Sequence, residues 1–331
     1  MVSLGELDVV GIGNALVDVL SQADEATLSR QGLVKGSMQL VDEDHARTLY
    51  DAMGPGVEVS GGSAANTMVG VASFGGRAHY VGKVRDDQLG DVFGHDLRAT
   101  GVGYDTPRAI SGPATGRCLI LVTPDAQRTM STFLGASSGL GPADVDPALI
   151  ARAKILYLEG YLFDPPEAQE AFRAAAAIAH GAGRQVALTL SDPFCVDRHR
   201  AAFLDLVQHH VDILFANEAE IRALYEVADF DSALRQVRGH CEIAALTRSA
   251  DGSVLVGGGK VHPVAAHPVS AVVDTTGAGD LYAAGVLYGV SRGLDLPTCG
   301  RLGSLAAAEV IGHVGARPTV PLARLAGPML A

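Results

Sequence analysis

Val272–Gly285 has the sequence VVDTTGAGDLYAAG, in which β-branched residues run into a turn of small residues and then into a helical pattern. We expect a strand, a tight turn and a helix that begins near the end of that turn. The unpaired N–H groups of Gly277, Ala278 and Gly279 would lie at the helix N-terminus, where the helix dipole favours an anion. Side chains this small would let a phosphoryl group approach the backbone beside Asp280. The alternative is an ordinary aspartate cap behind a glycine turn.

Asp280 is a candidate base for a hydroxyl group. A carboxylate with a pKa near ~4 removes a proton from an alcohol poorly in the ground state. Phosphoryl transfer passes through a loose transition state, so the hydroxyl proton can leave late. Asp280 would then orient the hydroxyl oxygen toward phosphorus and accept its proton, while the anion-binding turn stabilises the developing charge.

The chain upstream of this turn alternates between strand and helix patterns, most regularly after residue 154. Such alternation indicates βαβ units and a mostly parallel sheet covered on both faces. The strands expected here are Leu7–Gly13, His79–Lys83, Lys154–Glu159, Gln185–Leu190, Asp212–Ala216, Ile243–Thr247, Ser253–Val256, Lys260–His262 and Val269–Val273. The helices expected are Gly61–Ser73, Gln88–Thr100, Pro166–Ala182, Arg198–His209, Glu218–Glu226, Phe230–Arg238, Asp280–Ser291 and Thr298–Ile311.

Two β-rich stretches interrupt this α/β pattern. One holds the expected strands Leu16–Ser21 and Ser37–Asp42, and the other reads as a hairpin of Thr115–Thr123 and Arg128–Phe133 across a turn at 124–127. We expect residues 14–42 and 113–134 to pair into a small discontinuous sheet that acts as a lid. Residues 1–13, 43–112 and 135–331 would form a large α/β domain.

Composition excludes several classes of protein. The 331 residues are 48% hydrophobic, enough for two lobes or for one large domain with an appendage. A net charge of −12 disfavours nucleic acid and anionic membranes as partners, although backbone N–H groups can still bind a small anion. The four cysteines form no CxxC pair, which argues against zinc and indicates a reducing compartment. Without a signal peptide or a run of about 20 apolar residues, a cytoplasmic protein is expected.

Two further clusters carry polar groups suited to a hydroxylated ligand. Ser60–Asn66 reads SGGSAAN, in which the glycines allow close backbone approach and Asn66 can bridge two hydroxyls. The alternative is a glycine turn with Ser63 capping a helix. Asn14 and Asp18 form the other cluster, and Asp18, flanked by two valines, could bind vicinal hydroxyls or could simply be solvated.

Asn217–Glu220 lies at the start of an expected helix and has the spacing of a capping box. Glu220 could also hold water on Mg²⁺ near nucleotide phosphates, and the two interpretations are compatible. Residues 247–252 could be a simple hairpin turn, and Arg128 a solvated surface charge. A dinucleotide site is excluded at Gly11-Ile12-Gly13, because Leu16 replaces the third glycine and a strand follows.

Taken together, these motifs resemble the PfkB, or ribokinase-like, family of carbohydrate kinases. Gly61–Asn66, followed by Gly70 and Gly75-Gly76, is similar to its N-terminal signature, and Asp274–Asp280 to its C-terminal signature. The resemblance covers nearly the whole chain. It implies a three-layer ribokinase-like α/β fold with a mostly parallel central sheet and a small β-sheet lid. The chain most resembles the members that phosphorylate adenosine, through Gly11–Asp18, Gly160–Leu162, Leu188–Phe194 and Val211–Glu218.

The resemblance also implies roles for individual residues. The catalytic group would be Asp280, Gly277, Ala278, Gly279 and Arg128, with Arg128 reaching from the lid toward the transferring phosphoryl group. The acceptor's ribose would be held by Asn14, Asp18, Gly62, Ser63 and Asn66, and its purine by Leu16, Leu40, Leu134 and Leu162. Leu162 stands where such members can carry a phenylalanine that stacks on the base. ATP and Mg²⁺ would be bound by Asn217, Glu220, Thr247, Arg248 and Gly252, with Glu220 acting on Mg²⁺ through water. Asp274 and Thr276 would help to hold a monovalent cation such as K⁺.

The expected reaction is transfer of the γ-phosphoryl group of ATP to the 5′-hydroxyl of a nucleoside, with adenosine giving AMP in purine salvage. Two alternatives stay open: a sugar kinase of the same family acting on ribose or a ketohexose, and a non-catalytic nucleotide-binding protein. We expect a monomer or homodimer with small-molecule ligands.

Overall fold

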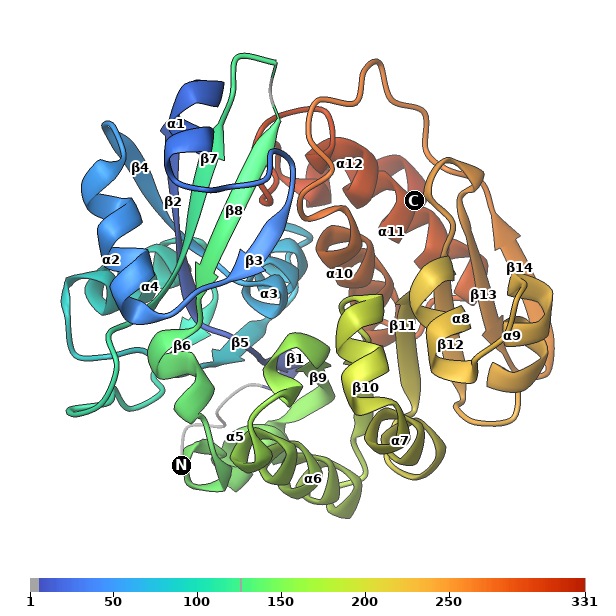
Figure 1. Ribbon diagram of the computed structural model, residues 1–331. Coiled ribbons are helices and arrows are strands. Elements are labelled where there is room, and N and C mark those ends of the chain that lie inside the picture. Colours follow the sequence, from blue (N-terminus) through green and yellow to red (C-terminus); the bar gives the residue numbers. More distant parts are fainter. Residues whose placement is uncertain (1–5, 126, 331) are drawn as a thin grey trace.

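The computed structural model describes residues 6–125 and 127–330, and a nine-stranded sheet is the largest element within them (Figure 1). Its strands, in order across the sheet, are β14 (Lys260–Val264), β13 (Ser253–Gly257), β12 (Ile243–Thr247), β11 (Ile213–Asn217), β10 (Gln185–Thr189), β9 (Ala153–Glu159), β1 (Leu7–Ile12), β5 (Ala78–Val81) and β6 (Gly103–Tyr104). β13 pairs antiparallel with both β12 and β14 at one edge, and the other neighbours are parallel. The expected mostly parallel sheet is confirmed.

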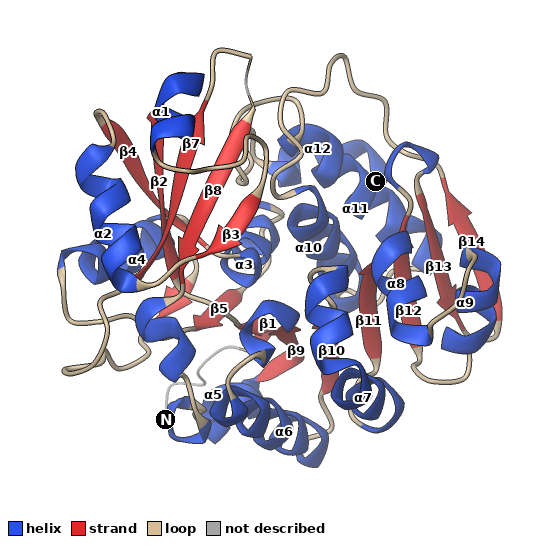
Figure 2. Ribbon diagram, in the orientation of Figure 1, coloured by secondary structure: helices blue, strands red, loops and turns tan. Residues whose placement is uncertain are grey.

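Both faces of this sheet are buried, because alternate residues of a strand point to opposite sides. In β9, Leu156 and Leu158 belong to one hydrophobic cluster, whereas Ile155 and Tyr157 belong to another. This explains why its strands read as continuous apolar runs. The first face is covered by α5 (Pro147–Arg152), α6 (Pro166–Gly181), α7 (Pro193–His209), α8 (Glu218–Tyr225) and α9 (Phe230–Val237). The second is covered by α3 (Ser63–Ser73), α4 (Gln88–Ala99), α10 (Ala278–Ser291) and α11 (Leu296–Val310), with α12 (Leu322–Leu330) packed outside against α3 and α11 (Figure 2).

A second sheet, five-stranded within the described residues, lies beside the first. Its order is β3 (Met38–Leu40), β8 (Arg128–Phe133), β7 (Gly116–Val122), β2 (Leu16–Gln22) and β4 (Gly56–Gly61), and α1 (Glu25–Arg30) and α2 (Glu43–Ala52) accompany it. β7 and β8 form the expected antiparallel hairpin, although residue 126 of its turn lies outside the described residues. The small sheet expected from the two β-rich stretches is therefore present.

Two details of the sequence analysis differ from the structure. β4 pairs with β2 in the smaller sheet, whereas residues 43–112 were all expected in the large domain. Its last residues belong to the glycine motif, which suggested a turn rather than a strand end. Val269–Val273 is not a strand but a loop, in which Val272 and Val273 are exposed. Among the described residues, the only backbone hydrogen bond of this loop joins the Val273 amide to the Ile311 carbonyl at 2.8 Å. The loop therefore forms no strand pairing.

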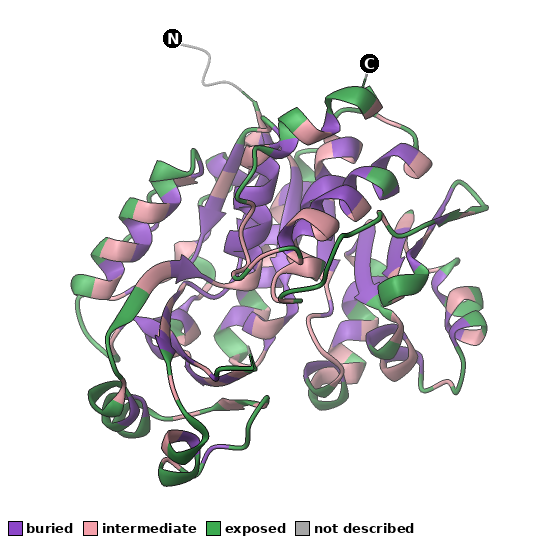
Figure 3. Cartoon of the chain, turned by 90° about the horizontal axis from the view of Figure 1, so that it is seen from above, coloured by how far each residue is buried: buried purple, intermediate pink, exposed green. Residues whose placement is uncertain are grey.

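The alternation of β2 decides which of its side chains can meet a ligand. Val17 and Val19 are buried in the core beneath the smaller sheet. Leu16 and Asp18, on the opposite face of the strand, keep part of their surface open. Figure 3 shows the buried central strands with more exposed segments around them. Asp18 therefore faces the space between the two sheets rather than the core.

Candidate active site

The polar candidates gather where the parallel strands of the large sheet end. Asn14 follows β1, Glu159 ends β9, and Asn217 and Thr247 end β11 and β12 as direct neighbours in the strand register. The carboxyl ends of parallel strands meet at this edge, which is where ligands bind in open α/β sheets. The topology thus brings together residues that are more than 200 positions apart in the sequence.

The glycine turn before α10 is built as an N-terminal anion site requires. Gly277 caps the helix with φ of 80°, and a Cβ on it would lie 2.7 Å from the backbone of Ala316. Among the described residues, the amides of Gly277 and Gly279 donate to no protein group, while Ala278 donates to the Thr275 carbonyl at 3.2 Å. A Cβ on Gly279 would meet nothing within 4 Å. The turn is therefore rigid at Gly277 and open at Gly279.

Asp280 lies in the first turn of α10 and contacts two side chains of α3. Ser63 Oγ donates to Asp280 Oδ1 at 2.6 Å, and Asn66 Nδ2 donates to Oδ2 at 3.1 Å. Burial raises the pKa of Asp280, and these two hydrogen bonds oppose the rise. The two helices approach closely because Gly70 faces Ala284, where a Cβ would stand only 2.5 Å from the alanine methyl group. Asp280 is thus held in one orientation rather than free as a simple cap.

Asp18 and the glycines of the SGGSAAN stretch form the side of the site nearest the smaller sheet. Gly62 has φ of 99°, and a Cβ there would lie 2.2 Å from the Asn14 carbonyl oxygen. A Cβ on Gly61 would lie 2.5 Å from the Asp18 carboxyl group. Burial raises the pKa of Asp18 to about 6, and the charges of Arg317 and Arg128 oppose this rise. The glycines therefore make the space that Asp18 occupies.

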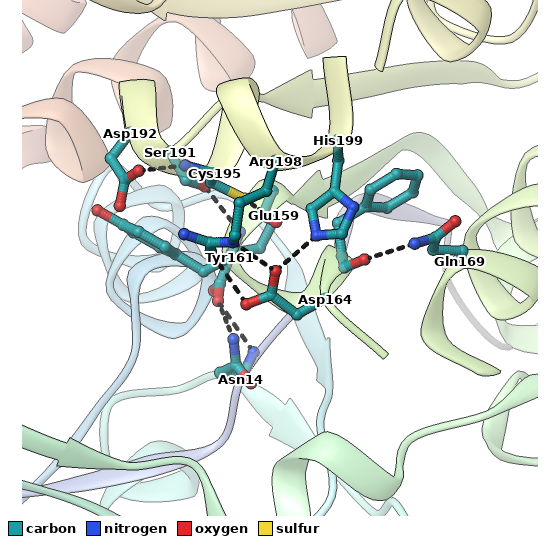
Figure 4. A network of polar contacts seen from close by, with 12 residues as sticks. Asn14, Glu159, Tyr161, Asp164, Gln169, Ser191, Asp192, Cys195, Arg198 and His199 are labelled. Atoms are coloured by element: carbon teal, nitrogen blue, oxygen red, sulfur yellow. Dashed lines mark hydrogen bonds and ion pairs between the residues drawn. The ribbon is translucent and has the colours of Figure 1, made fainter. Parts of the chain in front are cut away.

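Glu159 is a residue that the sequence analysis did not select. Its Oε1 accepts from the backbone and side-chain nitrogens of Asn14 at 3.2 and 2.9 Å, and its Oε2 accepts from the Ala64 amide at 2.7 Å (Figure 4). Burial raises the pKa of Glu159 to about 7, against these hydrogen bonds. Asn14 is only 2% exposed, and its Oδ1 accepts from Ser137 Oγ at 2.9 Å. A charged residue ending an otherwise apolar strand was the available signal.

Leu162 does not line the site, although the sequence analysis expected it to. Its side chain is 1% exposed and packs in the hydrophobic core between the sheet and the helices α5–α9. Its neighbour Tyr161 lies at the site instead, between Asn14 and Asp192 in the view of Figure 4. Burial raises the pKa of Tyr161 well above its usual range, and the charges of Asp192 and Asp280 add to the rise. The site therefore contains an aromatic ring, one position before Leu162 in the sequence.

The other apolar candidates surround the lid side of the site. Leu16 and Leu134 are half-buried, and both border Gly116, where a Cβ would touch the Leu16 side chain and the Leu134 carbonyl. Leu40 lies on β3 at the edge of the smaller sheet and is 54% exposed. The structure thus brings Leu16 and Leu134 together and leaves Leu40 open.

The residues assigned to ATP lie at and just after the carboxyl ends of β11 and β12. Asn217 and Glu220 form a capping box, in which Glu220 Oε2 accepts from the Asn217 amide at 2.9 Å. Burial raises the pKa of Glu220 to about 7. Arg248 donates to Glu218 Oε2 at 3.0 Å and lies over the ring of Phe230. Thr247 and Gly252 flank the turn that follows β12, where Gly252 has φ of 83°. The capping interpretation is confirmed.

The carboxylate of Asp274 is occupied by groups of the chain itself. Its Oδ1 accepts from the amide and hydroxyl of Thr276 at 3.0 and 2.7 Å, and its Oδ2 accepts from the Gly315 amide at 2.9 Å. Arg128 Nη2 lies 2.7 Å from the same Oδ2, and both side chains are nearly buried. The guanidinium charge at this oxygen disfavours a monovalent cation on Asp274 as the two side chains are arranged.

Arg317 is the second residue that sequence reasoning missed. It lies between α11 and α12, yet its guanidinium reaches Asn66 Oδ1 at 3.3 Å and Ser60 Oγ at 2.8 Å. Burial lowers its pKa. An arginine in a Gly-Ala-Arg-Pro stretch carries no signal of such a position, because the loop that turns it inward is set by the packing of the two helices.

The sequence matches the model of the pfkB family of carbohydrate kinases over residues 37–323, and the chain belongs to this family. Each helix within the described residues is too short or too polar to span a bilayer.

Individual relatives carry names more specific than that of the family. A solved structure of adenosine kinase from Sinorhizobium meliloti matches with a TM-score of 0.91 at 52% identity, covering 98% of this chain and 99% of that one. A structure described as a probable sugar kinase from Rhizobium etli CFN 42 has a TM-score of 0.91 at 48% identity, with the same coverage. Adenosine kinase 1 from Arabidopsis thaliana is 27% identical over 93% of this chain and 94% of its own length.

Proposed function

We propose that this chain is an ATP-dependent adenosine kinase, which transfers the γ-phosphoryl group to the 5′-hydroxyl of adenosine and releases AMP and ADP. The observation that carries this function is the position of Asp280, fixed by Ser63 and Asn66 beside the open backbone at Gly279. Relatives named adenosine kinase, one of them 52% identical, support the choice of acceptor. A protein that only bound nucleotides would have no use for a base held at that point.

The chemistry follows from this geometry. The 5′-oxygen of the acceptor attacks the γ-phosphorus, its proton passes to the Asp280 carboxylate, and the bond from the γ-phosphorus to the bridging oxygen breaks to leave ADP. Because the transition state is loose, the proton can move late, and a carboxylate suffices as base. The amides of Gly277 and Gly279 would stabilise the oxygens of the transferring group, and Arg128 would add positive charge beside the same turn.

The acceptor would lie between Asp18 and Tyr161. An ionised Asp18 accepts hydrogen bonds from two neighbouring hydroxyls, as the 2′ and 3′ positions of ribose require. Tyr161 would supply the aromatic face for the purine, since base–aromatic stacking is worth about 1–3 kcal/mol. Leu16 and Leu134 would complete the apolar wall, and Asn14, Gly62 and Ser63 the polar one. The acceptor site thus no longer depends on Leu162.

ATP would bind along the ends of β11 and β12, at Asn217, Thr247, Arg248 and Gly252. Mg²⁺ neutralises phosphate charge when it accompanies ATP. An oxygen donor of the right kind exists in Glu220, whose carboxylate oxygens are engaged by Asn217 and retain capacity for a water molecule. We also propose a cytoplasmic location, in keeping with four cysteines that are all unpaired, and a monomer or homodimer as the assembly.

An ADP-release assay with saturating MgATP tests the function directly. Adenosine, other nucleosides, ribose and fructose are compared at equal concentrations, and the AMP product is identified by chromatography. We expect the highest kcat/KM with adenosine, because ribose and fructose cannot use the aromatic and apolar wall. Faster turnover of ribose or fructose would make the chain a sugar kinase, and no ADP with any acceptor would indicate a non-catalytic nucleotide-binding protein.

A further inference from the structure

Arg317 turns its guanidinium group from the loop between α11 and α12 into the site. Nε donates to Asn66 Oδ1 at 3.3 Å and Nη1 donates to Ser60 Oγ at 2.8 Å. Within the described residues, Nη2 is buried and has no hydrogen-bond partner. A buried charge costs desolvation free energy that a mere brace between two loops would not require. The burial of this charged group is therefore best explained by the groups of the site that it contacts.

The first reason is the orientation of the Asn66 amide. Its Oδ1 accepts from Arg317, so its Nδ2 is directed at Asp280 Oδ2, 3.1 Å away. If the amide were flipped, its NH₂ group would face a guanidinium N–H and its oxygen would face a carboxylate oxygen, so neither pair could form a hydrogen bond. Arg317 therefore fixes which end of Asn66 meets Asp280, and through it the direction of the carboxylate.

The second reason is the charge of Asp18. No hydrogen bond to the Asp18 carboxylate is present within the described residues, and burial raises its pKa. The groups that face it are Arg317 from the C-terminal loop, Arg128 from β8, Asp280 from α10 and the Cys118 thiol from β7. Arg317 contacts Ser60, and the next residue, Gly61, lies directly against the Asp18 carboxyl group, so the guanidinium lies near that carboxylate. Its charge opposes the rise in the Asp18 pKa more than that of Arg128 does. Its charge favours the ionised form that can accept two hydroxyl hydrogen bonds.

We propose that Arg317 is a positioning residue for phosphoryl transfer: it fixes the Asn66 amide toward Asp280 and holds Asp18 as a carboxylate for the acceptor's hydroxyls. The proposal rests on the function above and adds a residue that lies outside both signature motifs. A purely structural role predicts something different, namely that Arg317 serves through its contact with Ser60 to tie the C-terminal loop to β4.

Three variants separate these roles. Arg317→Met removes the charge and the hydrogen bonds, Arg317→Lys keeps the charge but cannot reach Asn66 and Ser60 in the same fork, and Ser60→Ala removes only the contact with β4. For each we measure kcat and KM for adenosine across pH, thermal stability and ATP affinity.

The proposal predicts distinct results. Arg317→Met lowers kcat/KM at least about tenfold, the scale of a lost charged hydrogen bond, and moves its acid limb to higher pH because Asp18 loses an opposing charge. Arg317→Lys restores the acid limb while kcat stays low. Ser60→Ala keeps both near the wild-type values. The proposal would be overturned if Arg317→Met left kcat/KM and the acid limb of its pH profile unchanged. It would also be overturned if all three variants lost activity only in proportion to their thermal stability.

A second measurement keeps this test separate from the proposed function. The Asp18 carboxyl group is titrated by carbon-13 NMR without any substrate, with Asp18→Asn used to assign the signal. Its pKa should rise in Arg317→Met and return toward the wild-type value in Arg317→Lys. If the wild type shows no turnover with adenosine, the acceptor assignment fails, but a raised Asp18 pKa in Arg317→Met still supports the electrostatic role. An unchanged pKa contradicts that role whatever the acceptor.

Discussion

The carboxyl groups of Asp18, Glu159 and Asp280 come from three different elements, and burial raises the pKa of each. The charge of Asp280 adds to the rise at the other two, so an ionised Asp280 disfavours the ionisation of Asp18 and of Glu159. Arg317 and Arg128 offset part of this repulsion at Asp18. Charge in the site is therefore set first by burial and then by neighbouring charges, and a base of this kind works best at neutral to alkaline pH.

Glu159 gives a prediction about stability and pH. Its pKa in the folded protein is about 7, above the ordinary value of 4.5. The stabilisation from its bound proton is fully present below the unfolded pKa and is lost as pH rises through the folded pKa. The free energy of unfolding of the wild type should therefore fall between about pH 5 and pH 8, and Glu159→Gln should flatten that fall.

Urea unfolding across this pH range measures the effect. Glu159→Gln should also be less stable by about 1–3 kcal/mol, because its amide cannot accept all the hydrogen bonds now made from Asn14 and Ala64. Glu170→Gln, an exposed change on α6, is the matched control and should follow the wild type. An equally steep fall in Glu159→Gln would show that other groups produce the pH dependence.

At the scale of elements, the N-terminus of α10 depends on two glycines in different ways. Gly277→Ala should destabilise the protein, because φ of 80° is unfavourable for alanine by about 1–2 kcal/mol and its Cβ would meet Ala316. Gly279→Ala should leave stability nearly unchanged yet lower kcat about 10²-fold, since its methyl group would fill the space meant for the phosphoryl group.

Thermal melts and steady-state kinetics on the two variants check this contrast. Gly181→Ala, in an open position at the end of α6, serves as the control and should change neither quantity. If Gly279→Ala turns over adenosine at the wild-type rate, the phosphoryl group does not pass over that backbone.

The sequence predicted the elements of the large sheet well, because strands buried on both faces, such as β9 and β10, are short apolar runs between helical patterns. It failed where packing decides. β4 ends in glycines and is a strand only because β2 lies beside it, while Val269–Val273 has strand-like residues but pairs with no strand in the described part of the chain. The signature motifs located Asp280 and Asn66, but their sequence could not show Glu159 or Arg317, whose positions depend on distant elements.

At the scale of the whole molecule, charged side chains join the smaller sheet to the large domain. Arg128 of β8 pairs with Asp274, and Arg317 joins Ser60 of β4. Closure of such a lid over the acceptor would exclude water from the reaction. Residues 14–42, 113–134 and the added strand β4 are the segments we propose to move as this lid.

The Arg128–Asp274 contact predicts how the enzyme responds to monovalent cations. Because a guanidinium already lies against Asp274, turnover in KCl should match turnover in tetramethylammonium chloride at equal ionic strength, within about twofold. Initial rates at saturating MgATP and adenosine provide the measurement. Saturable activation by K⁺ alone would mean that Arg128 leaves Asp274 during the reaction.

Replacing the proposed base tests the entire account most directly. Asp280→Asn can keep both contacts of the native residue, since its oxygen can accept from Asn66 and its amide can donate to Ser63. We predict that kcat with adenosine falls at least about 10³-fold, in line with the loss of an essential proton acceptor, while ATP affinity and thermal stability stay close to the wild type. Asp205→Asn, an exposed change on α7, should remain fully active. An Asp280→Asn enzyme that phosphorylates adenosine at the wild-type rate would contradict the account.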